Sequence, residues 1–318
     1  MNQELHKDTQ VSNFYGGKTM RKGKVIVLKH HPMNLKFINP WYTKQVDGDL
    51  SEYEVVDVTS RVTRNKEFMA KHPGFNRDIS PFYMGPVHTS EGLTAHVFEH
   101  FWQVSKVFPC HYDKDTDTIK PEYFSWRKKW FDIEKVINKT ASRRPHSQLG
   151  YSDGDCLFSV RYVNGTWERM GYVEARKKMY IPEYAKLVVK TRSFKWLKKM
   201  YDEGKKIALV DFDGYNFDYN VAKEKLYNTY INKCKKNHAE PVHTLEDFLN
   251  LRTMQDVINC GFTPAGHGFI IKMLLDGNLE VKGDQVIDHI GVLNYENGGE
   301  VPKPLPFTRE GHNNEINY

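Results

Sequence analysis

The segment LTAHVFEHFWQVSKVF, from Leu93 to Phe108, places two histidines, a glutamate, a glutamine and a lysine among large apolar side chains. The apolar residues recur at helical spacing, which predicts a helix over roughly 94–107. On such a helix Glu99, Gln103 and Lys106 stand at positions i, i+4 and i+7, so they share one face. Burying a carboxylate, an amide and an ammonium without partners is costly. The pattern therefore favours a polar pocket lined by these three side chains.

The same segment also fits a zinc motif. His96, Glu99 and His100 match H-x-x-E-H, in which two histidines on one face of a helix bind zinc and the glutamate activates zinc-bound water. A catalytic zinc needs a third ligand, for which Glu174 is a candidate. We expect no metal, because only two zinc ligands are close together in the sequence. The spacing of the four cysteines also fits no zinc site, and we interpret them as reduced thiols: Cys110, Cys156, Cys234 and Cys260.

The charge of the chain is unevenly distributed. The residues from Asp276 to the end carry eight acidic and three basic side chains, a net charge of −5, which leaves +11 on the rest of a chain whose formal net charge is +6. Two stretches, Ser125–Pro145 and Glu174–Met200, mix Lys and Arg with aromatic rings. A surface of this composition can bind a polyanion, but solvent-exposed amphipathic helices have the same sequence pattern. The candidate nucleic-acid surface comprises Arg143, Arg144, Lys198 and Lys199.

The helices and strands that position these residues can be predicted from hydrophobic periodicity and from Gly and Pro residues at their ends. Strands are expected in the Val- and Ile-rich segments 23–31, 53–60, 155–165 and 205–214. Helices are expected at 124–140, 168–180, 181–190, 194–204, 222–236, 244–259 and 266–277. Regular alternation of strands and helices is absent from this order, so the sequence predicts a helix-rich α+β protein with a small sheet.

The loop ISPFYMGP (79–86), followed by VFEHFWQVSKVF (97–108), resembles the NADAR (YbiA-like) superfamily of N-glycosidases. Members carry an S-N-F or S-P-F loop and then a helix with the pattern E-x-x-x-Q-x-x-K. The segments 167–180, 205–218 and 266–275 resemble later family segments in the same order. The resemblance implies a single-domain NADAR-like core over 71–275, with an N-terminal extension over 1–70 that contains short strands and an acidic tail over 276–318.

The resemblance also implies a reaction and a set of site residues. NADAR proteins cleave the bond between a ribose carbon and a nitrogen, and a carboxylate beside the sugar can stabilise the positive charge that develops or deprotonate the attacking water. Glu99 is the catalytic candidate, and either Asp211 or Asp213 is the second acid. The expected substrate-binding residues are Gln103, which would orient the substrate; Lys106, which would hold a phosphate or pair with Glu99; Trp167 as a stacking ring; Ser80, Phe82 and Tyr83 at the rim; and His267.

Known family substrates are ribosylamino-pyrimidine phosphates of riboflavin synthesis and ADP-ribose attached to guanine in DNA. The basic stretches favour the second, so we expect an ADP-ribosylated nucleic acid as partner and no cofactor. The composition resembles that of large lytic-phage proteins, which suggests an anti-defence enzyme that reverses host ADP-ribosylation of phage DNA. An inactive nucleotide- or nucleic-acid-binding protein is a further alternative.

Location can also be predicted from the chain. A run of eighteen apolar residues and an apolar signal-peptide core are both missing from the sequence. We therefore expect no membrane association and a cytoplasmic protein, in the host cytoplasm if a phage encodes it. Its oligomeric state is open.

Overall fold

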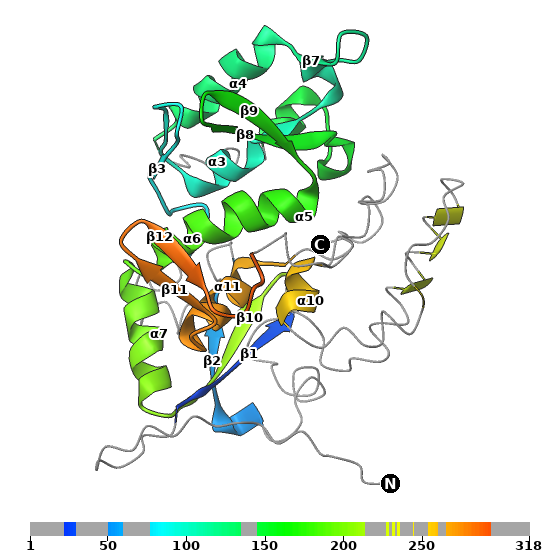
Figure 1. The fold of residues 1–318 in the computed structure, drawn as a ribbon. Helices are drawn as coiled ribbons and strands as arrows, with labels where there is room; N and C mark the ends of the chain where they lie inside the picture. The colour runs from blue at the N-terminus through cyan, green and yellow to red at the C-terminus, as the bar shows by residue number, and fades with distance from the viewer. Residues whose placement is uncertain are drawn as a thin grey trace, which may run out of the picture.

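The computed structural model describes residues 22–29, 50–59, 77–134, 145–213, 254–259 and 265–293, with a few single residues between 227 and 244. Helices and small sheets alternate irregularly along these segments (Figure 1), which confirms the predicted α+β class. Within the described residues, the structure has no helix with the length and apolar character needed to cross a membrane.

A parallel sheet of β1 (Lys24–Lys29), β10 (Lys206–Asp211) and β2 (Tyr53–Asp57), in that order, lies at one end of the molecule. Its strands are rich in Val and Ile because alternate side chains enter two different apolar clusters, one on each face. The central strand, β10, belongs to the segment expected as the core, whereas β1 and β2 come from the first 70 residues. The sheet therefore joins chain from both sides of the boundary expected at residue 70.

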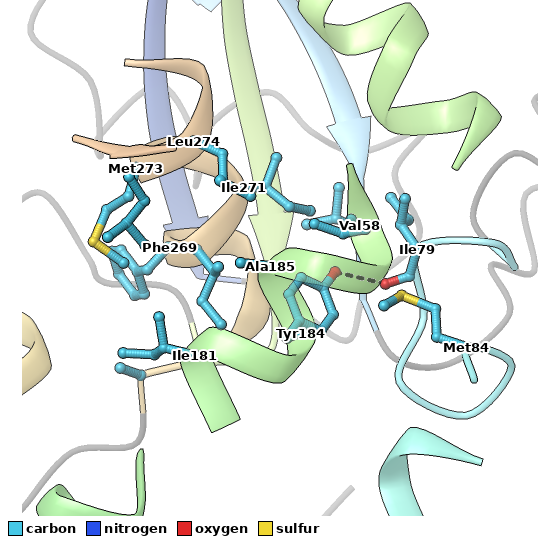
Figure 2. Packing of buried hydrophobic residues seen from close by; sticks show 14 of the residues in the cluster. Val58, Ile79, Met84, Ile181, Tyr184, Ala185, Phe269, Ile271, Met273 and Leu274 are labelled. Carbon is cyan, nitrogen blue, oxygen red and sulfur yellow. Dashed lines mark hydrogen bonds between the residues drawn. The ribbon is translucent and has the colours of Figure 1, made fainter. Parts of the chain in front are cut away.

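Three helices pack beside this sheet: α6 (Ile181–Val188), α7 (Arg192–Asp202) and α11 (His267–Leu275). Figure 2 shows apolar side chains of α6 and α11 near Val58, which follows β2, and Ile79 in the loop before α3. The hairpin of β11 (Leu279–Lys282) and β12 (Gln285–Asp288) packs on α6 and α11. The chain thus continues as folded structure beyond the start of the expected acidic tail at residue 276.

The other part of the molecule surrounds α3 (Phe98–Gln103) and α4 (Pro121–Phe131). An antiparallel sheet orders β5 (Lys106–Val107), β8 (Phe158–Val163) and β9 (Thr166–Met170). Helix α5 (Tyr172–Ala175) continues through a π-helical turn, Arg176–Tyr180, directly into α6. The smaller elements are β3 (Val87–His88) with β4 (Thr94–Ala95), β6 (Tyr112–Asp113) with β7 (Thr118–Ile119), α10 (Met254–Asn259), and the 3-10 turns Leu50–Glu52, Pro109–His111, Pro145–Leu149 and Asp153–Asp155.

The helix predicted over 94–107 is wrong in extent. Its first residues form strand β4, Val97 is extended, and only Phe98–Gln103 is helical. The Ser105 hydroxyl donates to the Trp102 carbonyl at 2.7 Å and occupies an acceptor of the last turn. The backbone of 105–107 then pairs with β8, for example through Val160 N–H to the Ser105 carbonyl at 2.8 Å. Sheet pairing with a distant segment therefore ends the helix one turn early.

Other expected helices differ in their ends. Residues 168–170, expected as helix, belong to strand β9, which pairs with β8. Helix α4 ends at Phe131, and residues 135–140 of the expected helix lie outside the described residues. Most of the helices expected at 222–236 and 244–259 also lie outside them, apart from α10 and single helical residues.

The Tyr184 hydroxyl ties α6 to the loop before α3. It donates to the Ile79 carbonyl at 2.7 Å, and both residues are fully buried (Figure 2). We expect Tyr184→Phe to lower the free energy of unfolding by about 1–2 kcal/mol, because it leaves a buried carbonyl without this donor. Chemical denaturation measures the change, and Tyr83→Phe, which removes an exposed hydroxyl, is the matched control. Equal stability of the two variants would contradict the assignment.

Candidate active site

A pocket of about 110 Å³ lies where the carboxyl end of β10 meets α3, the π-helical turn and the start of α11. Three carboxylates from two distant parts of the chain line it, together with one guanidinium, one imidazole and several aromatic rings. The carboxyl edge of a parallel sheet is a frequent place for ligand sites, because the loops that follow the strands gather there. The lining residues are Pro81, Phe82, Glu99, Trp102, Gln103, Tyr172, Arg176, Tyr180, Asp211, Asp213, Ala265 and His267.

Glu99 stands in the first turn of α3 with 9% of its surface exposed. Its backbone N–H donates to the Pro81 carbonyl at 2.9 Å, which ties the helix start to the S-P-F loop. Its Oε1 accepts a hydrogen bond of 2.8 Å from Nε2 of Gln103, one turn later. The predicted pairing of Glu99 with Gln103 on one helix face is therefore present, and the carboxylate is held in one orientation.

Lys106 joins this pair from a different element than predicted. It lies on β5 rather than on α3, and its Nζ donates to Oε1 of Gln103 at 2.8 Å and to Oδ1 of Asp153 at 2.6 Å. Its side chain is buried behind Gln103 and does not line the pocket. Lys106 therefore supports the pocket wall, and Gln103 connects its ammonium to the Glu99 carboxylate.

Asp211 is the last residue of β10 and is 1% exposed. Its Oδ2 accepts a 2.8 Å hydrogen bond from the backbone N–H of Gly268 and lies 3.6 Å from Nδ1 of His267, at the start of α11. The positive end of the α11 dipole favours a carboxylate here. Asp213 is half-buried and lines the same pocket. Both candidates for the second acid thus reach the site, and Asp211 also holds α11.

The glycines around Asp211 explain how closely the helix approaches. A Cβ on Gly266 would come within 2.5 Å of Asp211 Oδ2 and 2.9 Å of Asp213 Cβ. A Cβ on Gly268 would lie 3.0 Å from the same carboxylate oxygen. Both distances are shorter than ordinary contact, so residues without side chains are needed where α11 meets the acids.

Six lining residues are absent from the set predicted from the sequence: Pro81, Trp102, Tyr172, Arg176, Tyr180 and Ala265. Arg176 is buried, donates to the Ile258 carbonyl at 2.8 Å, and places its guanidinium 4.6 Å from the Tyr172 ring centroid. Burial, with the nearby Glu99, Tyr184, Asp211 and Asp213, raises the pKa of Tyr180 well above its ordinary value, so its hydroxyl stays protonated. The four-residue spacing of Tyr172, Arg176 and Tyr180 is the signal that could have indicated them.

Several predicted site residues lie outside the pocket wall. Ser80 is buried, and its Oγ accepts from the Phe82 N–H at 3.3 Å, so it shapes the loop that carries Phe82. Tyr83 is 49% exposed beside that loop. The structure does not place Trp167 at the pocket, because β9 carries its ring toward α4, where it packs 5.2 Å from the ring of Phe124 and 5.2 Å from the Arg127 guanidinium.

The zinc alternative requires His96, Glu99 and His100 to converge, and they do not. His96 is exposed and precedes α3, whereas His100 is buried against Trp130 with its ring 5.0 Å away. Glu99 faces the pocket, and Glu174 pairs with Lys178 at 2.7 Å. In the described part of the chain, His, Cys, Asp and Glu side chains form no cluster of three that could hold a metal ion. Because α3 begins at Phe98, His96 lies before the helix and does not share a helix face with His100, as this alternative requires.

Several basic side chains of the two stretches form ion pairs with acids, among them Arg127 with Glu91 and Lys186 with Glu183. Lys198 forms an ion pair with Asp202, and Lys199 lies 3.8 Å from Glu203, each one turn along α7. Arg143 and Arg144 lie outside the described residues. Helix α4 carries the described start of the first stretch, and the second stretch runs from α5 through α6 to α7. Helices α4 and α7 lie toward opposite ends of the molecule in Figure 1.

The chain was compared with known protein families, proteins and structures. No protein-family model, curated protein or solved structure matches this chain. The arrangement of acids, rings and the buried guanidinium in the pocket is therefore the basis on which a function must be argued.

The position of His100 predicts a pH dependence of stability. Burial lowers the pKa of His100 from 6.5 to about 4, against a smaller opposing effect of the Trp130 backbone. The unfolded chain therefore binds more protons than the folded chain between these values. This contribution to stability, up to about 3 kcal/mol, is complete above about pH 6.5 and is lost as the pH falls toward 4.

We expect His100→Gln to flatten the decline of the free energy of unfolding between pH 6.5 and 4.5, measured by denaturant titration at several pH values. His111, whose pKa burial also lowers, contributes in the same direction in both proteins. The exposed imidazole of His96 makes His96→Gln the matched control. An unchanged slope in the His100 variant would contradict the burial of a neutral imidazole.

Proposed function

We propose that this chain is an N-glycosidase that hydrolyses a ribose C1′–N bond, with ADP-ribose attached to guanine in DNA as the favoured substrate. The observation that carries the proposal is the meeting of Glu99 with Asp211 and Asp213 in one small pocket. The resemblance to NADAR proteins points to Glu99 and to either Asp211 or Asp213 as the second acid, and the two segments that carry these residues lie far apart in the chain. Paired carboxylates beside a sugar are the equipment of glycoside hydrolysis.

The reaction assigns a role to each group. Water attacks C1′ while the C1′–N bond breaks and its electron pair moves to the leaving nitrogen, which takes up a proton. Glu99, oriented by Gln103, accepts a proton from the water and stabilises the positive charge on the sugar. Asp211 and Asp213 add negative charge on the opposite side of the pocket. Tyr180 lines the same pocket, and its protonated hydroxyl is available there as a hydrogen-bond donor to the substrate.

The size of the pocket fits part of such a substrate. A closed apolar cavity of about 150 Å³ holds one benzene ring, so a pocket of about 110 Å³ suits a group the size of one sugar ring. Half-buried Phe82, Tyr172 and Asp213 line it, so it reaches the surface. A pentose can therefore enter while the base and the remaining phosphates stay outside.

A second candidate is a ribosylamino-pyrimidine phosphate, which contains the same kind of bond. The pairing of Lys198 and Lys199 with acids on α7 favours it, because paired lysines contribute less to phosphate binding. An inactive binding protein is a third candidate. The orientation of the Glu99 carboxylate by a dedicated amide argues for chemistry, since a plain binding pocket for an anionic nucleotide has no use for three carboxylates.

The first test of the chemistry is Glu99→Gln. The substitution keeps the shape of the side chain and an oxygen that can accept from Gln103, so the protein should fold. Turnover of guanine-ADP-ribosylated DNA should fall by about a hundredfold or more, the scale of a lost acid–base group. Release of ADP-ribose is measured by chromatography, with Glu122→Gln, an exposed glutamate on α4, as the matched control. Wild-type turnover by a folded Glu99→Gln protein would refute the role of Glu99.

The choice of substrate is tested by salt. If Lys and Arg side chains contact phosphates next to the modified base, KM for a modified oligonucleotide should rise steeply with salt, because association releases counterions. The double variant Lys198→Gln, Lys199→Gln should raise KM for the oligonucleotide and spare a small ADP-ribosyl nucleoside. Hydrolysis of the ribosylamino-pyrimidine phosphate alone would assign the chain to the metabolic substrate.

A further inference from the structure

A chain of four polar side chains runs from the pocket, through buried Gln103 and Lys106, to half-buried Asp153. Glu99 Oε1 accepts from Gln103 Nε2 at 2.8 Å, and Gln103 Oε1 accepts from Lys106 Nζ at 2.8 Å. The same ammonium donates to Asp153 Oδ1 at 2.6 Å. Glu99, Gln103 and Lys106 belong to the motif that resembles the NADAR pattern, whereas Asp153 comes from a separate turn, to which the sequence pattern assigns no role.

The turn that carries Asp153 is well defined. Ser152 donates from its N–H and its Oγ to Oδ2 of Asp155, both at 2.8 Å, which closes a capping box around the 3-10 turn Asp153–Asp155. The chain then enters β8, which pairs with β5 so that Ser159 stands opposite Lys106. Local hydrogen bonds and sheet pairing together bring the Asp153 carboxylate to the Lys106 ammonium.

The charge of Asp153 decides where the Lys106 ammonium rests. Lys106 is 6% exposed, so its charge needs acceptors within the protein. The Asp153 carboxylate is a charged acceptor for the Lys106 ammonium, and the Gln103 side-chain carbonyl is a neutral one. His146, whose Nε2 lies 3.8 Å from the same Asp153 oxygen, also borders the pair. Without the Asp153 charge, the next carboxylate along the chain of contacts is Glu99, so the ammonium would be drawn toward the pocket acid.

We propose that Asp153 is a positioning residue: it holds Lys106, Lys106 fixes the Gln103 amide, and the amide orients the Glu99 carboxylate toward the pocket. The reversed amide would point its NH₂ group at the ammonium, so the Asp153–Lys106 pair permits only one orientation of Gln103. Asp153 thereby keeps Lys106 from neutralising Glu99 directly. The inference deepens the proposed hydrolase function and rests on it.

The kinetic test uses variants of Asp153 and its neighbours in the full-length protein. Asp153→Asn should lower kcat about tenfold or more while KM changes less than about threefold, because the residue positions a group and does not touch substrate. Asp153→Glu, which keeps the charge, should recover most of the loss. In a Lys106→Met background the Asp153→Asn change should have no further effect, since the two act as one unit.

Asp155→Asn is the matched control, because it weakens the same turn without removing the partner of Lys106. An equal loss of kcat in Asp155→Asn would show a merely structural role and overturn the proposal. Additive effects of Asp153→Asn and Lys106→Met would overturn it as well.

A second readout does not depend on activity. The side-chain NH₂ resonances of Gln103, identified by their disappearance in Gln103→Leu, should shift in Asp153→Asn and stay in place in Asp155→Asn. Unchanged resonances in Asp153→Asn would refute the positioning role even in an active enzyme. A shift in a protein that hydrolyses none of the substrates would support the contact chain and refute the proposed function instead.

Discussion

The hydrogen bond from the Gly268 N–H to the Asp211 carboxylate joins the end of strand β10 to the start of helix α11, and the pocket is built around this junction. The contact requires close approach, which glycines at 266 and 268 allow. It orients α11 across the parallel sheet and brings His267 and Ala265 to the pocket wall. The same carboxylate that could assist catalysis is thus also part of the framework of the fold, so its loss would affect both.

On the opposite wall, the site depends on a chain of hydrogen bonds. Glu99 lies at the pocket end of this chain, and the ion pair of buried Lys106 with half-buried Asp153 lies at its other end. Buried polar groups are costly unless each finds a partner, so satisfying them selects one arrangement. The consequence for function is a carboxylate whose orientation is set by the protein itself, which is the form of preorganisation that acid–base and electrostatic catalysis need.

The part of this structure that could be predicted from the sequence is the part set by local pattern. Val- and Ile-rich runs located β1, β2 and β10, and helical periodicity with Gly and Pro located α6, α7 and α11. The pocket residues that the sequence indicates come from a resemblance and from polar residues at the ends of apolar elements: Glu99, Gln103, Asp211, Asp213, Phe82 and His267.

The features that the sequence does not indicate depend on contacts between distant segments. Strand β5 ends α3 early because it pairs with β8, about fifty residues later, and Lys106 consequently leaves the helix. The parallel pairing of β10 with two strands from the first 70 residues cannot be read from any one segment. Four-residue spacing places Arg176 and Tyr180 on one helix face, but it does not predict the π-helical form of the turn that carries them. Trp167, expected to stack on the substrate, lies outside the pocket wall because strand β9 directs its ring toward Phe124 and Arg127 of α4.

The most direct measurement of the central claim is a crystal structure of Glu99→Gln with a guanine-ADP-ribosylated oligonucleotide. The account predicts that the ribose lies in the pocket, with C1′ and its bonded nitrogen between residue 99 and the Asp211–Asp213 end of β10, and with the base outside. A ribose bound elsewhere on the protein, or a pocket that stays empty at saturating oligonucleotide, would contradict it.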